Sequence, residues 1–393
     1  MRALHLPGVP SGDEIPFHFP SKPPSALDLE YTSADYPDPD ARTTDLSASL
    51  QHFYLIRVLF TALTRGEITW QEILEPARFH SCGGAIPGHD VVGVVDKVFT
   101  SPKAESGPEF SPGDRVWALL DFDRDGAAAT YTLACEKELS LAPSDPVSST
   151  NIADKTWEEQ LATLPLSALT AYQALYTHGR LPLLSAESSP PSVASHKRVL
   201  ILGSAGSVGL PTLQLAKASG FSVVATCSSA SAALVTSLVD ITTDVLIDYT
   251  SEGYTSLPSA FDSRNLPPVD LVVDCIGGDT LSTLLLTSTP ALNTIINPGA
   301  RVVTIVAPVK VYGEETAEAI RRNCAGAGVE VEFFIVRPSG EELDFLARWV
   351  TAGKLKGYVQ EVFELHQGRD AMQFVEARGR RGGGKVVLRV ATQ

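Results

Sequence analysis

Three glycines at three-residue spacing, Gly203, Gly206 and Gly209, follow the continuous apolar run VLIL at residues 199–202. A short apolar run without polar alternation is typical of a strand buried on both faces of a parallel sheet. The residues after the glycines have helical periodicity, and residues 221–226 predict the next strand. The stretch therefore predicts a strand–turn–helix–strand unit, from which doubly wound parallel sheets are built.

The glycine turn also suggests a ligand. Glycines let such a turn bend tightly, and they let a diphosphate approach backbone N–H groups at the positive end of a helix. The spacing is GxxGxxG rather than the strict GxGxxG, so an ordinary α/β turn remains the alternative interpretation.

Length, charge and cysteine content limit the class of protein. A chain of 393 residues predicts two domains, and a net charge of −15 argues against nucleic acid and anionic membranes as partners. We find neither a cleavable leader nor an apolar run long enough to span a bilayer, so we expect a cytoplasmic protein. The five cysteines form no CxxC pair, which favours reduced, packed thiols.

The two halves of the chain have different patterns. Several short strands with turn signals and little helix predict a compact, barrel-like domain over roughly the first 150 residues. Beyond the glycine turn, strand-like runs at residues 245–249, 271–275 and 301–306 alternate with helical spacers. This alternation predicts a doubly wound parallel sheet.

The end of the second core strand bears on the choice of coenzyme. An NAD site usually places an acidic residue there to hold both ribose hydroxyls. Residues 226–229 are instead Thr-Cys-Ser-Ser, and no acid follows until Asp240, which favours the 2′-phosphate of NADP(H). Since no Lys or Arg lies between Lys217 and Arg264, we expect Lys385 or backbone donors to bind that phosphate, if any clamp exists.

The motifs LTRGEITW, IPGHDVVGVV, PGDRVWAL, LPLSALTAYQAL, VLILGSAGSVG and GGGKVVLRV occur in this order. The chain thereby resembles the medium-chain dehydrogenase/reductase superfamily, and within it the zinc-free quinone oxidoreductase and enoyl reductase branch. The resemblance implies an α/β protein with a GroES-like, partly open β-barrel catalytic domain and a Rossmann cofactor domain. The expected boundaries are 1–157 for the first part of the catalytic domain, 158–330 for the NADP-binding domain and 331–393 for the return.

Residue-by-residue comparison with zinc alcohol dehydrogenases predicts no catalytic metal. Thr64 stands where those enzymes have a Cys ligand, and His89 is followed by Asp90 rather than Glu. Leu166 or Ser167 occupies the third ligand position. One imidazole does not make a tetrahedral zinc site, and Cys82, which precedes His89, is too loosely placed to complete one. We therefore expect His89 to be a hydrogen-bonded structural residue rather than a metal ligand or an acid.

The resemblance implies three candidate catalytic residues. Thr64 matches the place where related quinone reductases put a polar residue against the nicotinamide, although a turn hydroxyl capping a short helix is the alternative. Thr170 and Tyr172 match the helix that packs under the nicotinamide, and Tyr172 could instead be a core residue.

The resemblance to this superfamily also implies which residues contact the cofactor. The diphosphate is expected at the glycine turn, the 2′-phosphate after the second strand, the adenosine beside an aromatic residue, and the nicotinamide at the last strand ends. The corresponding residues are Ala205, Gly206, Ser207, Val208, Ser228, Ser229, Tyr249, Gly277, Val306 and Ala307.

The expected function is NADPH-dependent, zinc-independent hydride transfer to an activated C=C or a quinone by a monomer or homodimer. A narrower resemblance to fungal enoyl reductases of natural-product pathways implies a carrier-tethered enoyl substrate and a polyketide synthase as partner. The alternative is a cofactor-binding family member recruited for a non-redox role, such as cyclisation in a biosynthetic pathway.

Overall fold

The computed structural model describes residues 1–6, 25–33, 51–70, 86–122, 124–145, 155–183, 197–377 and 383–391. The chain forms two compact units. The first contains residues 1–166, 337–380 and 385–393, and the second contains residues 167–336 and 381–384. The predicted boundaries at 157 and 330 precede the observed ones, which follow residues 166 and 336. Cys82 lies outside the described residues.

The first unit is built on a seven-stranded sheet of order β14-β15-β3-β4-β5-β7, with β6 paired to β3. The long strand β3 is almost wholly buried, because its β-branched and aromatic side chains face the core on both sides. Helices α2, α10 and α11 also belong to this unit, as does a small antiparallel pair of strands. The strands are β1 (Ala3–His5), β2 (Glu30–Thr32), β3 (Phe53–Leu63), β4 (Asp90–Phe99), β5 (Arg115–Leu119), β6 (Tyr131–Cys135), β7 (Leu139–Leu141), β14 (Val359–Glu364) and β15 (Lys385–Arg389), and the helices are α2 (Trp157–Ala162), α10 (Gly340–Thr351) and α11 (Gly368–Glu376).

Glycine allows two close backbone approaches in this sheet. A Cβ on Gly93 would lie 2.6 Å from the Arg57 carbonyl oxygen on β3. Gly88 has φ +83°, and a Cβ there would lie 2.5 Å from Thr61 Oγ1. Both glycines therefore stand where a side chain would separate neighbouring segments of the chain.

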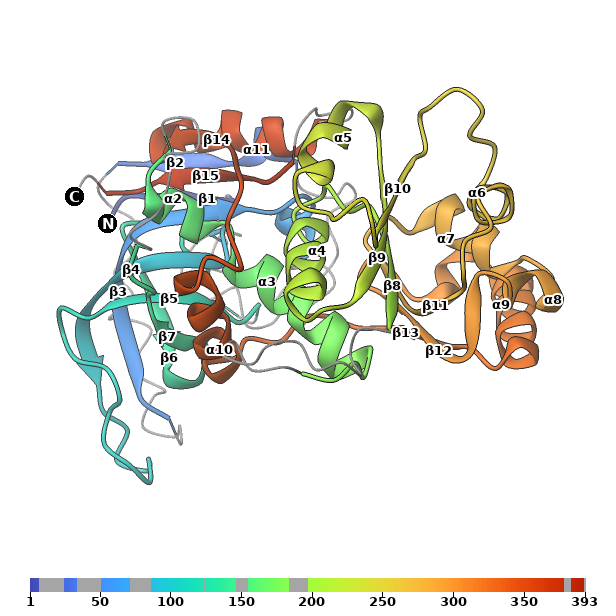
Figure 1. Cartoon of the computed structure of the whole chain (residues 1–393). Helices are drawn as coiled ribbons and strands as arrows, with labels where there is room; N and C mark the ends of the chain where they lie inside the picture. Colours follow the sequence, from blue (N-terminus) through green and yellow to red (C-terminus); the bar gives the residue numbers. More distant parts are fainter. Residues whose placement is uncertain are drawn as a thin grey trace. The chain divides into compact units, whose positions relative to one another are not determined.

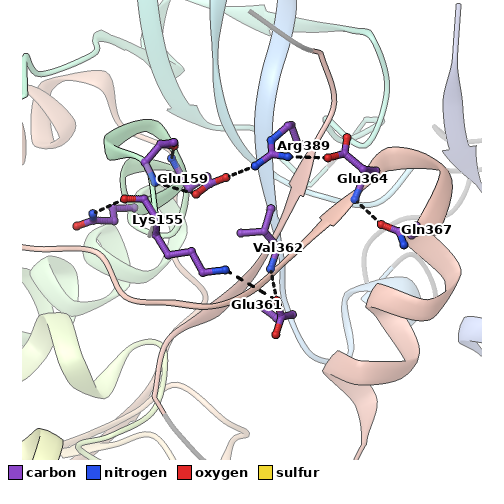
Figure 2. Close-up of polar contacts among 9 residues, drawn as sticks. Lys155, Glu159, Glu361, Val362, Glu364, Gln367 and Arg389 are labelled. Atoms are coloured by element: carbon purple, nitrogen blue, oxygen red, sulfur yellow. Dashed lines mark hydrogen bonds and ion pairs between the residues drawn. The ribbon is translucent and has the colours of Figure 1, made fainter. Parts of the chain in front are cut away.

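The C-terminal return completes the sheet. Strand β15 pairs antiparallel with β3 and parallel with β14. At its end, Arg389 donates to Glu159 on α2 and to Glu364 on β14, and Lys155 lies near Glu361 (Figure 2). These ion pairs connect three segments that are distant in the sequence.

The second unit is a six-stranded parallel sheet of order β10-β9-β8-β11-β12-β13. In Figure 1, helices α4 and α5 lie on the left of this sheet and α7 and α9 on the right, so both faces are covered. This is the predicted Rossmann sheet. Its strands are β8 (Arg198–Leu202), β9 (Ser222–Cys227), β10 (Val245–Asp248), β11 (Val269–Asp274), β12 (Ile296–Thr304) and β13 (Glu330–Phe333), and the helices are α3 (Pro165–Tyr172), α4 (Gly209–Ala218), α5 (Ser229–Thr236), α6 (Leu257–Ser263), α7 (Gly278–Leu285), α8 (Thr289–Leu292) and α9 (Glu314–Ala327).

Each unit has its own apolar core. The core of the first gathers side chains from its sheet and from α11, whereas the core of the second lies between its parallel sheet and helices α6 to α9. Within the described residues, no helix is both long and apolar enough to cross a bilayer.

Candidate active site

The glycine turn lies between β8 and α4 in the second unit. Gly203 has φ +83°, and a Cβ on Gly209 would lie 2.1 Å from the Gly203 carbonyl oxygen, so α4 packs directly against the end of β8. Within the described residues, the backbone N–H groups of Ala205, Ser207 and Val208 make no hydrogen bond. These donors stand at the start of a ten-residue helix, where a diphosphate fits by charge and by hydrogen bonding.

Gly383 approaches the same turn from the C-terminal segment. A Cβ at this position would lie 2.9 Å from the Ala205 carbonyl oxygen and 2.7 Å from a methyl carbon of Leu234. Gly383 of the GGGK motif therefore lies against the glycine turn, while the lysine of the motif begins β15.

The ends of β9 and β10 lie side by side. Ser228 precedes α5, and Ser229 Oγ donates to Asp248 Oδ2 at 2.5 Å, while Thr250 Oγ1 donates to Asp248 Oδ1 at 2.7 Å. These hydrogen bonds lower the pKa of Asp248, so it is anionic at neutral pH. Tyr249 next to it is 44% exposed, consistent with an open aromatic face.

The ends of β11 and β12 adjoin the glycine turn across the sheet. Gly277 has φ +65°, and a Cβ there would lie 2.8 Å from Val306 Cγ1. Buried Asp274 holds the two strand ends together, because it accepts hydrogen bonds from Gly277 N at 2.9 Å and from Thr304 Oγ1 at 2.7 Å. Val306 is 45% exposed, and Ala307 follows it after the end of β12.

The predicted cofactor residues thus share the carboxyl edge of one parallel sheet. Ligands of open α/β sheets bind at this edge, which makes the arrangement fit a dinucleotide. Of the predicted catalytic residues in this unit, Thr170 is buried within α3 and Tyr172 packs edge-to-face on Tyr176, with ring centroids 5.1 Å apart. A π-helical turn, Gln173–His178, follows α3, and such turns are frequent at functional sites.

Thr64 belongs to a separate polar cluster in the first unit. Lys385 Nζ donates to Thr64 Oγ1 at 2.9 Å and forms an ion pair with Asp90 Oδ2. Asp90 Oδ1 accepts a hydrogen bond from Leu166 N at 2.6 Å. The side chains of Lys385 and Asp90 are 3% and 0% exposed. The prediction that Lys385 binds a 2′-phosphate is wrong, because its buried ammonium is already engaged by Asp90 and Thr64.

Glu67 adds a second carboxyl group to the cluster. It is buried, Oε1 accepts a hydrogen bond from Gly88 N at 3.1 Å, and Oε2 has no partner among the described residues. Burial raises the pKa of Glu67 to about 8, although Lys385 opposes this. One ammonium faces two buried carboxyl groups, and it contacts Asp90. Burial raises the pKa of Asp90 too, but the Lys385 ammonium and the hydrogen bond from Leu166 N both lower it. We therefore assign the negative charge to Asp90, while Glu67 keeps its proton at neutral pH.

These residues do not fit a zinc ion. Both oxygens of Asp90 are occupied, and the lysine ammonium on Thr64 would repel a divalent cation. His89 is buried in an aromatic group, with its ring 6.0 Å from Trp70 and 5.2 Å from Phe122. In the described part of the chain, no three His, Cys, Asp or Glu side chains gather where they could hold a metal.

Sequence reasoning missed three residues of these sites, Glu67, Asp248 and Asp274, and it missed the role of Lys385. Asp248 and Asp274 each end a parallel strand, a position at which polar residues signal a site. An acid that holds the ribose is expected at the end of β9, whereas Asp248 ends the neighbouring strand β10. The burial of Glu67 and Lys385 depends on pairing between β15 and β3 and carries no local signal.

The parallel sheet with its glycine turn, together with the separate seven-stranded unit, has the organisation of a nicotinamide-dependent oxidoreductase. The chain belongs to the medium-chain dehydrogenase/reductase superfamily. Residues 242–388 match the sequence profile of the zinc-binding dehydrogenase family.

Relatives and solved structures agree with this assignment. The chain is 32% identical over 338 residues to a probable mitochondrial zinc-binding oxidoreductase of Arthroderma benhamiae, covering 86% of this chain and 88% of the relative. It is 26% identical to the trans-enoyl reductase pgmF of Aspergillus terreus, covering 86% of each chain. The quinone oxidoreductase of Coxiella burnetii has the same fold, with a TM-score of 0.67, 20% identity and coverage of 100% and 99%.

Proposed function

We propose that the protein is an NADPH-dependent, zinc-independent reductase that transfers hydride to an activated C=C bond or a quinone. The observation that carries the proposal is the contact between Lys385 and Thr64, which supplies a polarised hydroxyl where zinc enzymes have a metal ligand. Reduction of a conjugated C=C requires hydrogen-bond donors for the developing oxyanion and no Lewis acid.

The residues of the second unit have binding roles in this proposal. When bound, the nicotinamide coenzyme supplies the hydride. The backbone amides of Ala205, Ser207 and Val208, which have no partner among the described residues, bind the diphosphate. Tyr249 offers its exposed ring to the adenine. The 2′-phosphate lies at Ser228 and Ser229, since no carboxylate ends β9. Ser228 donates to it, whereas Asp248 holds the hydroxyl proton of Ser229. Gly277, Val306 and Ala307 border the nicotinamide end.

Thr64 has the donor role in catalysis. Its hydroxyl stabilises the carbonyl oxygen of the acceptor as negative charge develops on it, and water supplies the proton that completes the reduction. Thr170 and Tyr172 support the nicotinamide from α3.

The test is NADPH oxidation with a panel of enones, enoyl thioesters and quinones, combined with metal analysis of the purified protein. We expect turnover with at least one acceptor class, unaffected by a zinc chelator. Cofactor-binding protein that oxidises NADPH with none of them would contradict the proposal, and so would stoichiometric zinc whose removal abolishes turnover.

We further propose that the substrate is an enoyl thioester carried by a synthase of secondary metabolism, such as a polyketide synthase. The similarity to a protein named a trans-enoyl reductase supports this. Rates with one enoyl chain should be compared on a carrier domain, on pantetheine and as a free acid. A higher kcat/KM for the carrier-bound form is expected, and a preference for the free form would contradict it.

A further inference from the structure

The contact between Lys385 and Thr64 fixes the direction of a hydrogen bond. A protonated lysine has three N–H donors and no acceptor, so Thr64 Oγ1 must accept from Nζ at 2.9 Å. The hydroxyl proton of Thr64 is therefore directed away from Lys385. Among the described residues no acceptor takes that proton, and Thr64 is partly exposed, so it can be donated to a ligand.

The lysine is itself held in one place. Val386 pairs with Leu63 across β15 and β3, which puts Lys385 beside Thr64. The ion pair with Asp90 holds the ammonium, and Leu166 N holds the second oxygen of Asp90. Because the lysine side chain is 3% exposed, water does not compete for its donors.

A buried ammonium also changes the strength of the hydroxyl as a donor. Negative charge gathers on Thr64 Oγ1 as its proton moves toward an oxyanion, and the positive charge at 2.9 Å stabilises that redistribution. Hydrogen bonds that involve an ionised partner are stronger than neutral ones, and the effect grows in a medium of low dielectric constant. The lysine thus acts on a bound oxygen through Thr64.

We propose that Lys385 is a positioning residue that makes the Thr64 hydroxyl an obligatory donor to the oxyanion of the reduced acceptor. The inference rests on the proposed function. In that reaction, hydride forms a new C–H bond at the β-carbon, and the C=C electron pair moves toward the carbonyl carbon, whose oxygen becomes negative. Thr64 stabilises this enolate, water then protonates its α-carbon, and NADPH is oxidised to NADP⁺.

The experiment is a double-mutant cycle on the single-turnover rate of NADPH oxidation with the best acceptor found. The first variant is Thr64→Val, which keeps the shape of the side chain and removes the donor. Thr64→Val is made in the wild-type protein and again in a protein that carries Lys385→Met and Asp90→Asn. This double change removes the ion pair without leaving a charge buried alone. Thr64→Ser keeps the hydroxyl.

We expect Thr64→Val to lower the rate about 100-fold in the wild-type background, the usual effect of removing one oxyanion donor. In the Lys385→Met/Asp90→Asn background, Thr64→Val should lower the rate less than about tenfold, because an unpolarised hydroxyl stabilises the oxyanion less. Thr64→Ser should restore most of the rate. The Kd for NADPH, from fluorescence titration, should be unchanged by Thr64→Val.

Two further measurements separate this role from a merely structural one. Urea unfolding establishes that each variant is folded at the assay temperature. Lys155→Met with Glu361→Gln removes another lysine–carboxylate pair of the same unit, and it should leave the effect of Thr64→Val at its wild-type size (Figure 2).

An equal loss from Thr64→Val in both backgrounds would overturn the inference and leave the reductase assignment intact. So would an unchanged rate for Thr64→Val alone. If the wild-type protein oxidises NADPH with no acceptor of the panel, the proposed function fails, and the inference fails with it.

Discussion

Ser229 Oγ lies 2.5 Å from Asp248 Oδ2, and this hydrogen bond joins the start of α5 to the end of β10. The contact fixes a serine at the point where the 2′-phosphate of NADPH is expected. It also brings a carboxylate to that point from the neighbouring strand. Asp248 therefore opposes a phosphate in two ways, as a like charge and as the acceptor of the Ser229 hydroxyl proton.

The first prediction concerns coenzyme selectivity. Asp248→Asn keeps the side-chain shape and removes the negative charge, so we expect NADPH to bind several-fold more tightly, with little change for NADH. The gain should diminish at high salt, because Asp248 is partly exposed and its repulsion is screened. Fluorescence titration with both coenzymes at two salt concentrations measures this. Equal gains for NADH and NADPH would count against a 2′-phosphate at Ser229.

The second prediction concerns the glycine turn. Gly209→Ala places a Cβ 2.1 Å from a backbone oxygen that cannot move without separating α4 from β8. We expect a loss of about 1–3 kcal/mol in the free energy of unfolding, as overpacking usually costs. Gly206→Ala is the matched control, since its Cβ would lie 3.3 Å from the nearest atom and Gly206 is exposed. It should fold normally yet bind NADPH more weakly. Equal urea midpoints for both variants would contradict this account.

The sequence predicted the features that depend on short stretches. Residues 199–226 carry a complete local signal, and β8, α4 and β9 follow it closely. The cluster around Thr64 could not be predicted in the same way. Lys385 is more than three hundred residues from Thr64, and it reaches Thr64 only because β15 pairs with β3. Of the two expected alternatives for the phosphate, Lys385 is wrong for this reason, since the charge of a lysine does not reveal that it is buried.

The third prediction concerns the ion pairs in Figure 2. Glu159 is 2% exposed in its side chain, caps α2 through Thr156 N at 2.8 Å, and accepts from Arg389 at 2.6 Å. Arg389→Met leaves this buried carboxylate with a single partner, so we expect a loss of about 1–3 kcal/mol in the free energy of unfolding. Glu364→Gln is the control, because its side chain is 42% exposed and such pairs contribute at most about 1 kcal/mol. Urea unfolding measures both, and equal losses would show that burial of Glu159 is unimportant.

The fourth prediction concerns the pH dependence of stability. Burial raises the pKa of Glu67 from 4.5 to about 8, so between these values the folded protein keeps a proton that the unfolded chain has lost. The contribution of Glu67 to stability is therefore fully present below pH 4.5 and is lost as the pH rises toward 8. The slope is about −1.4 kcal/mol per pH unit.

Glu67→Gln isolates this contribution, because a glutamine keeps the shape of the protonated acid and does not titrate. We expect the variant to lose less stability than the wild-type protein between pH 5 and pH 8, a window chosen inside the two pKa values of Glu67. Urea unfolding of both proteins at several pH values measures the difference. Parallel stability curves would mean that Glu67 is ionised in the folded protein. One ammonium would then balance two buried negative charges, and the assignment of the charge to Asp90 alone would be wrong.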